Sequence, residues 1–144
     1  MTLIEVMMVV FIIGLATGLV VLTLPPRATP EEAAAKTFSS VLTRAQDQAI
    51  LSGQPVGLLL GEEGYSLLAW RGEQWDRVRG GAELARGLTL QIDDRREQVL
   101  ADGWPDLVFD PTGVSDGAMF QLRGRKARID ITLLASGEVQ LETR

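Results

Sequence analysis

An uncharged run from Val6 to Leu24 constrains the fold of this chain more than any other stretch of its sequence. An α-helix of these 19 residues would span roughly 28 Å at about 1.5 Å per residue, close to the hydrocarbon thickness of a bilayer. A buried core helix is the alternative, but it would be apolar on every side and would end in a Pro-Pro pair. We therefore predict an N-terminal transmembrane helix over residues 1–24, a break or kink at the prolines, and a separate domain over residues 25–144.

Glu5 carries the single charged side chain of the first 24 residues. A carboxylate near hydrocarbon is costly unless a cation or water meets it. No Lys or Arg precedes Glu5, so the nearest cation is an α-amino group, which residue 1 of a neighbouring subunit supplies if the helices pack in a staggered bundle. Glu5 is then an assembly contact. The alternative is that Glu5 only reaches the headgroup region and is solvated there.

Residues 2–6, Thr-Leu-Ile-Glu-Val, followed by the apolar run, resemble the N-terminus of processed type IV pilins and type II secretion pseudopilins. In that family an N-methylated Phe normally follows a short basic leader, which prepilin peptidase removes. Here Met1 stands at the Phe position without a leader, so either the numbering begins at the mature residue or a start Met replaces the native Phe. The resemblance implies processing and N-methylation at Met1. It implies assembly contacts at Thr2, Leu3, Ile4 and Glu5.

The composition of the chain narrows the chemistry open to the domain. The absence of Cys excludes a disulfide framework, and the absence of His and Cys removes the commonest metal ligands, general bases and thiol nucleophiles. The formal net charge of -5 argues against a surface that attracts nucleic acid over its whole extent. We therefore expect a protein that is not an enzyme and that has no cofactor and no metal, with nucleic acid an unlikely partner.

The first part of the domain carries the signals of an amphipathic helix over residues 29–52. Thr29 is the expected N-cap, Pro30 occupies the first helical position, and Glu32 completes a capping box. Gly53 is the expected C-cap. Apolar residues recur at helical spacing, so one face should pack on the domain. This face comprises Ala34, Phe38, Val41, Leu42, Ala45 and Ala49.

The remainder of the domain, residues 54–144, shows the short apolar runs and turn residues that are typical of a β-rich fold. Arg128, Asp130 and Thr132 alternate with apolar residues, which predicts one solvated and one buried face. The fold class that follows is α+β and, by the resemblance, type IV pilin-like: a long N-terminal helix, with a transmembrane and an amphipathic half, packed on an antiparallel β-sandwich-like domain. We predict strands over 56–60, 65–70, 75–79, 88–92, 107–109, 119–123, 127–134 and 138–141, with a hairpin turn over 61–64.

Two later segments are similar to the H-type minor pseudopilins and to the related FimT and FimU minor pilins. One is the junction of helix and first strand over residues 44–56, and the other is the run Phe-Asp-Pro-Thr-Gly over 109–113 with the terminal hairpin over 129–139. The resemblance implies a structural subunit near the tip of the type II secretion pseudopilus. It also implies a single-pass bacterial inner-membrane protein with a periplasmic domain. The implied partners are other minor pseudopilins, the major pseudopilin, the inner-membrane assembly platform and prepilin peptidase.

For two other groups of residues, a binding function competes with an ordinary structural role. An acidic group resembles a calcium loop, but its spacing does not match the EF-hand, so solvated turn residues are favoured. The three tryptophans could form a binding surface, but large aromatic residues at strand positions favour the core. The acidic group is Asp102, Asp106, Asp110 and Asp116, and the tryptophans are Trp70, Trp75 and Trp104.

A basic cluster between two predicted strands keeps a second function open. Its residues are Arg123, Arg125, Lys126 and Arg128. Some FimT-like minor pilins bind DNA through arginines, so the alternative is a type IV pilus minor pilin that binds DNA in transformation. A solvated hairpin tip is favoured, because the net charge is acidic and Asp130 lies close by. A third hypothesis is an anchored enzyme or binding module whose pilin-like start is accidental.

Overall fold

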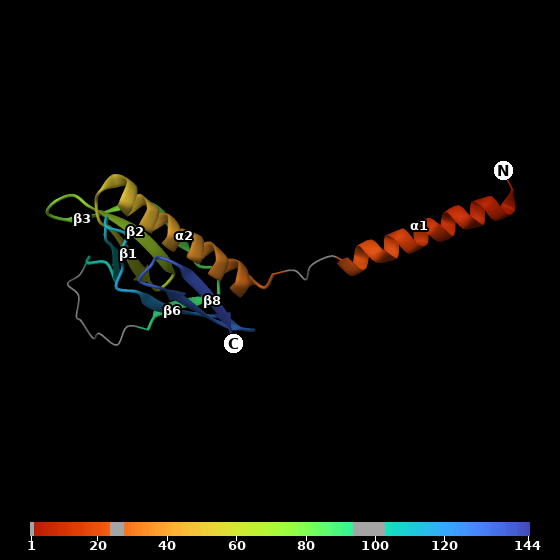
Figure 1. Ribbon diagram of the computed structural model, residues 1–144. Coiled ribbons are helices and arrows are strands. Elements are labelled where there is room, and N and C mark those ends of the chain that lie inside the picture. The colour runs from red at the N-terminus through yellow and green to blue at the C-terminus, as the bar shows by residue number, and fades with distance from the viewer. Residues whose placement is uncertain (1, 24–27, 94–102) are drawn as a thin grey trace.

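The computed structural model describes residues 2–23, 28–93 and 103–144 and shows a helix-and-sheet domain preceded by a separate helix (Figure 1). Met1, the predicted break at the two prolines and Asp102 lie outside the described residues. Every predicted helix and strand in the described part is present, with ends that shift by a few residues. The elements are α1 (Leu3–Thr23), α2 (Pro30–Ser52), β1 (Val56–Gly61), β2 (Gly64–Trp70), β3 (Trp75–Glu83), β4 (Thr89–Ile92), β5 (Leu107–Phe109), β6 (Ala118–Arg123), β7 (Arg128–Leu133) and β8 (Val139–Thr143).

Both predicted caps of α2 are confirmed. The Glu32 backbone N–H donates to Thr29 Oγ1 at 3.2 Å, and the Thr29 N–H donates to Glu32 Oε2 at 3.0 Å, so the two residues form a capping box. At the other end Gly53 has φ of 65°, the left-handed conformation that glycine adopts without a steric cost. These local hydrogen bonds fix where α2 begins and ends.

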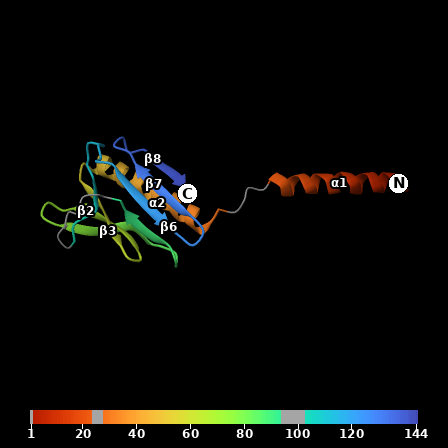
Figure 2. The same cartoon turned by 90° about the horizontal axis from the view of Figure 1, so that it is seen from below.

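The strands form two four-stranded antiparallel sheets, ordered β3-β2-β1-β5 and β4-β6-β7-β8. Helix α2 lies across both sheets, as the two perpendicular views show (Figure 2). Phe38 of α2 joins the layers, since its ring lies 5.0 Å from the ring of Tyr65 in β2 and 5.1 Å from that of Phe120 in β6. The core therefore lies between one helix and two sheets, as predicted.

The buried face of α2 matches the predicted one except at its start. Ala35 is buried where the periodicity indicated Ala34, which is half-buried against the core. Two polar residues on this face, Glu31 and Gln46, are also buried and were not anticipated. Gln46 Nε2 donates to the Gly113 carbonyl at 2.9 Å, so α2 is bonded to the turn after β5. Long-range hydrogen bonds of this kind compensate the burial of polar groups.

The prediction of a wholly solvated face on β7 is wrong at Asp130. This residue is only 8% exposed, whereas the neighbouring Arg128 and Thr132 on the same face are half-buried. Asp130 is covered because two arginines, Arg128 and Arg144, approach its carboxylate from either side. A long side chain two positions away on the same strand and another from beyond β8 can cover a short one between them, which period-two alternation does not reveal.

The assignment of the tryptophans to the core is also wrong. Trp104 is 49% exposed, and Trp70 and Trp75 are half-buried and lie outside the main core. The ring of Trp70 lies 5.3 Å from that of Trp75 and 6.4 Å from that of Trp104. Pro105 and Trp75 pack directly over Gly57: a Cβ added at Gly57 would lie 2.6 Å from Pro105 and 3.2 Å from the Trp75 ring. These two side chains therefore cover the glycine and do not pack under α2.

Helix α1 begins at Leu3 and ends at Thr23, while α2 begins at Pro30. Within residues 2–23, 28–93 and 103–144, no helix meets the length and apolarity that a bilayer crossing demands. The transmembrane helix over residues 1–24 and its separation from a domain over 25–144 stay predictions.

Candidate assembly surfaces

Over residues 2–17 the surface of α1 is largely apolar and is not buried by other described parts of the chain. Every residue from Thr2 to Thr17 is exposed, and the large apolar side chains here include Leu3 at 81% and Ile4 at 76% exposure. A helix whose apolar residues point in all directions is stable only when something else covers them. The described apolar surface of α1 is therefore a candidate contact surface.

Glu5 lies in the first turn of α1 and is exposed, beside the predicted assembly residues Thr2, Leu3 and Ile4. Its backbone N–H donates to the Thr2 carbonyl at 3.1 Å, which starts the helix. A carboxylate in the first turn interacts favourably with the positive end of the helix dipole. The structure therefore presents the Glu5 side chain on the outside of the helix, where a neighbouring chain can reach it.

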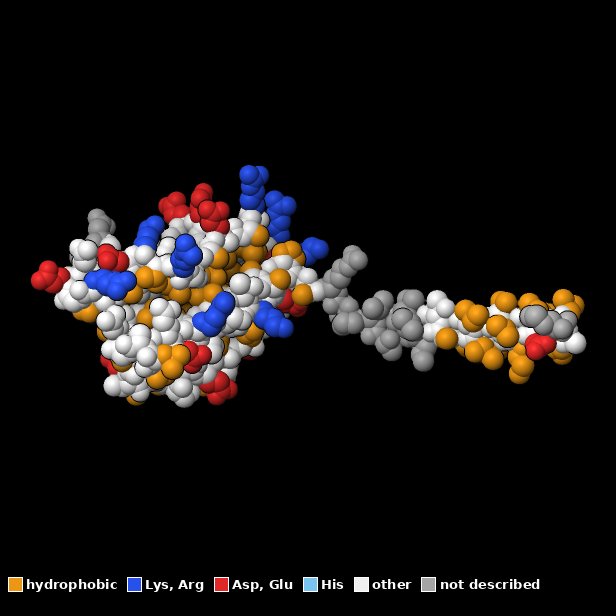
Figure 3. Space-filling view, turned by 90° about the horizontal axis from the view of Figure 1, so that it is seen from above, with side chains coloured by type: hydrophobic (Ala, Val, Ile, Leu, Met, Phe, Trp, Pro, Cys, Tyr) orange, Lys and Arg blue, Asp and Glu red, His pale blue; other side chains and the backbone are white. Residues whose placement is uncertain are grey.

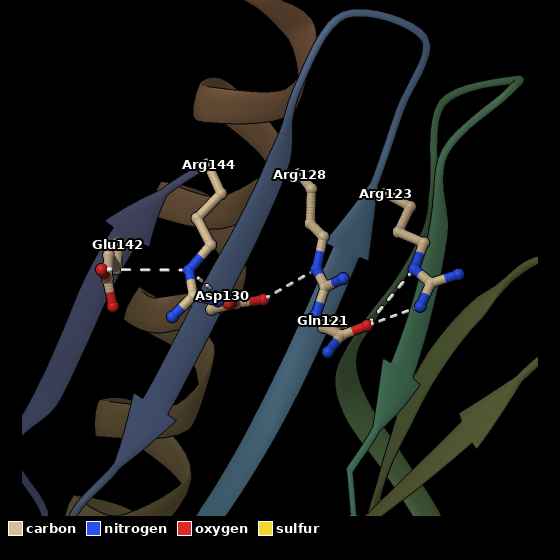
Figure 4. A network of polar contacts seen from close by, with 6 residues as sticks. All are labelled: Gln121, Arg123, Arg128, Asp130, Glu142 and Arg144. Carbon is tan, nitrogen blue, oxygen red and sulfur yellow. Dashed lines mark hydrogen bonds and ion pairs between the residues drawn. The ribbon is translucent and has the colours of Figure 1, made fainter.

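The predicted basic cluster lies at the turn between β6 and β7, and a polar network neutralises part of it (Figure 4). Arg128 Nε lies 3.2 Å from Asp130 Oδ1, and Arg144 Nε lies 3.5 Å from Asp130 Oδ2. Arg123 donates to Gln121 Oε1 at 2.8 Å through Nη2. The sequence placed Asp130 close to the cluster, but Arg144 was missed as a member of it. Backbone hydrogen bonds between Arg128 and Arg144 place Arg144 beside the cluster.

Glu31 fixes the turn of this cluster to the start of α2. Its Oε1 accepts the Lys126 backbone N–H at 3.1 Å, and a Cβ at Gly124 would overlap the Glu31 side chain. Only a glycine leaves room for the carboxylate here. Hydrogen bonds from its own backbone N–H, foremost, and from that of Lys126 hold the pKa of Glu31 below its usual range. Sequence patterns give no signal for this contact, because the partners lie 95 positions apart.

Replacing Glu31 with Gln should destabilise the domain at neutral pH, because the charge that holds the turn is lost. A carboxyl whose folded-state pKa is depressed contributes stability above its unfolded pKa, and that contribution is lost as pH falls through the folded pKa. The difference between the wild type and Glu31→Gln should therefore shrink below about pH 4.5, the ordinary Glu value. Urea unfolding at a series of pH values measures this difference in the free energy of unfolding. Glu73→Gln, at an exposed position, is the control, and a difference independent of pH would contradict the role of Glu31.

The acidic residues of the suspected calcium loop bind backbone groups of their own chain. Asp106 Oδ2 accepts the Leu60 N–H at 2.6 Å. Asp110 Oδ1 accepts the hydroxyl of Thr112 at 2.6 Å and its N–H at 2.8 Å, and these bonds lower the pKa of Asp110. Over the described ranges, no group of three or more His, Cys, Asp and Glu side chains is placed to hold a metal ion. The turn interpretation accounts for Asp106 and Asp110.

Comparison with known proteins gives both a family and a fold. The family model of Type II transport protein GspH matches residues 34–137. The structure is similar to the minor pseudopilin EpsH from the type 2 secretion system of Vibrio cholerae, with a TM-score of 0.66 and 18% identity over 79% of this chain and 97% of that one. It is also similar to Escherichia coli GspH, with a TM-score of 0.60 and 16% identity over 75% and 84%. A search of curated proteins found no match. The predicted pilin-like α+β fold is confirmed.

Proposed function

Because this chain belongs to the GspH family of type II transport proteins, we propose that it is a structural minor pseudopilin of a type II secretion pseudopilus. In this role the subunit is a building block, and its functional residues are those that meet other chains. The observation that carries the proposal is the family match over residues 34–137, which covers most of α2 and the strands β1 to β7. The pilin-like fold of the domain supports it.

The proposed mechanism begins with storage in the inner membrane. The uncharged run from Val6 to Leu24 holds the subunit in the bilayer before assembly, with the domain in the periplasm. Support comes from the exposed apolar surface of α1, which no other part of the chain covers in the described residues. Processing and methylation at residue 1 by prepilin peptidase belong to this stage.

Assembly then transfers the apolar helix from lipid to a bundle of neighbouring helices. Glu5 sets the register by pairing with the N-terminus of a neighbour, and Thr2, Leu3 and Ile4 pack around that contact. The neighbours are other minor pseudopilins near the tip and the major pseudopilin below, delivered by the inner-membrane assembly platform. Because Asp130 pairs with both Arg128 and Arg144 and so reduces the positive charge of the cluster, the structure favours this role over the DNA-binding pilin alternative.

Expression of the full chain, and of a variant lacking residues 1–24, in a strain without the native gene tests this proposal. The full chain should fractionate with inner membrane and restore secretion. The shortened chain should be released as a folded, soluble domain that restores none. An unfolded shortened chain by circular dichroism would show that anchor and domain are not independent. Restored secretion by the shortened chain would contradict the anchoring mechanism.

A further inference from the structure

The turn between β6 and β7, residues 124–127, lies at the end of the domain where the chain arrives from α1. Glu31, in the first turn of α2, accepts the Lys126 N–H, so the turn is bonded to the first turn of that helix. Helix α1 ends at Thr23 and α2 begins at Pro30, and a connection of this length spans at most about 25 Å when fully extended. The turn is therefore tethered close to the end of α1.

This end of the domain has cations that are not neutralised by the described residues. Arg128 and Arg144 share Asp130, but Arg125 and Lys126 are exposed, and neither forms a side-chain ion pair within the described parts of the chain. Lys and Arg side chains are visible on the surface of the domain in Figure 3. The hydrogen bond from Lys126 to Glu31 fixes the backbone of the turn, so these two cations are presented without a large cost of ordering.

We propose that this turn docks on the anionic phospholipid headgroups of the membrane that holds α1. This inference rests on the proposed membrane anchor. If α1 spans the bilayer, the short connection keeps Arg125 and Lys126 within reach of the headgroup phosphates. Each Lys or Arg near an anionic membrane surface strengthens binding by about fivefold. Docking would hold the stored subunit against the membrane, and its release would then precede entry into the filament.

A lipid surface fits the turn better than a nucleic acid does. Single-stranded nucleic acids are bound by aromatic side chains that stack on bases beside a basic groove. Here the tryptophan cluster lies at the opposite end of α2, since the Trp70 N–H donates to the carbonyl of Pro55, just after that helix ends. Lipid headgroups can instead contact only the two outermost cations, Arg125 and Lys126.

Full-length protein in vesicles of phosphatidylcholine, with or without phosphatidylglycerol, tests the inference. The chain has no native Cys, so a fluorophore can be attached to a single introduced one. Thr89→Cys reports on this end, because Thr89 is exposed and pairs with Arg123. Ser136→Cys, in the turn between β7 and β8 at the other end of β7, is the control. Headgroup-labelled quencher lipid should quench Thr89→Cys strongly only with phosphatidylglycerol, and about 1 M NaCl, where the Debye length is about 3 Å, should reverse this.

Charge variants identify the surface. The double variant Arg125→Gln and Lys126→Gln should weaken docking by about 25-fold, fivefold for each cation. The matched control Arg77→Gln and Arg79→Gln, on the exposed strand β3, should leave quenching unchanged. Equal quenching with and without phosphatidylglycerol, or an unchanged Arg125→Gln and Lys126→Gln variant, would overturn the inference. Micromolar binding of duplex DNA that this variant abolishes, with no lipid effect, would assign the turn to nucleic acid instead.

Flotation of the vesicles separates this inference from the proposed anchor. If the chain floats with both lipids even in high salt, but quenching does not depend on lipid charge, the result supports the anchor and contradicts the docking surface. If the chain floats only with phosphatidylglycerol and is released by salt, the docking surface stands and the anchor fails. A chain that floats with neither lipid contradicts both.

Discussion

Replacing Phe38 with Ala should lower the free energy of unfolding of the domain by about 3–5 kcal/mol. The Phe38 side chain is fully buried and its ring makes edge contacts with Tyr65 and Phe120, one from each sheet. The substitution removes apolar contacts and leaves a cavity where the three layers meet. A small domain typically has only about 5–15 kcal/mol of stability, so this loss removes a large share of it.

Urea unfolding followed by circular dichroism measures the effect of Phe38→Ala. Lys36→Ala is the matched control on the exposed face of the same helix, and it should change the free energy of unfolding by less than about 0.5 kcal/mol. Phe38→Leu should fall between the two, because it retains part of the apolar volume. A loss below about 1 kcal/mol for Phe38→Ala would show that α2 is held on the sheets mainly by other contacts.

Replacing Glu5 with Gln should abolish incorporation of the subunit into the filament and reduce secretion wherever this subunit is limiting. Gln has the size of Glu and some of its hydrogen bonding, but it lacks the charge that would pair with a neighbour's N-terminus. Insertion and folding should be unchanged, because α2 begins at Pro30, well after this position. Glu5→Ala should behave in the same way. Glu5→Asp should also be impaired, because a shorter side chain withdraws the carboxylate from a contact that helix packing fixes.

Cysteine crosslinking reports the register of neighbouring anchors directly, and the absence of native Cys makes single pairs unambiguous. Wild-type protein should crosslink at one register along α1, whereas Glu5→Gln at equal protein level should crosslink weakly or at several. Glu32→Gln, which removes an acidic residue of the capping box of α2, is a control for loss of charge outside the anchor. Wild-type crosslinking and secretion by Glu5→Gln would show that Glu5 is only a solvated headgroup residue.

The features that the sequence predicts correctly depend on neighbours along the chain. The capping box of Thr29 and Glu32, the left-handed Gly53 and the hairpin at residues 61–64 each involve contacts within a few residues. The apolar periodicity of α2 and the short strands follows from the geometry of helix and strand themselves. The pilin-like fold could be predicted because the N-terminal residues 2–6 and the later motifs are short and local. The family match over residues 34–137 covers most of the later motifs, whereas residues 2–6 lie outside it.

The features that the sequence could not supply depend on which strands become neighbours. Asp130 is covered by Arg128 and by Arg144, which follows β8, and Glu31 is buried where it meets the turn of Lys126. Trp104 is half exposed because it lies beside Trp70 outside the core, and its residue type alone favoured burial. Local hydrogen bonds and periodicity thus determined the elements of this protein. Tertiary packing decided its buried charges and surfaces, because pairing across sheets joins residues that no sequence period connects.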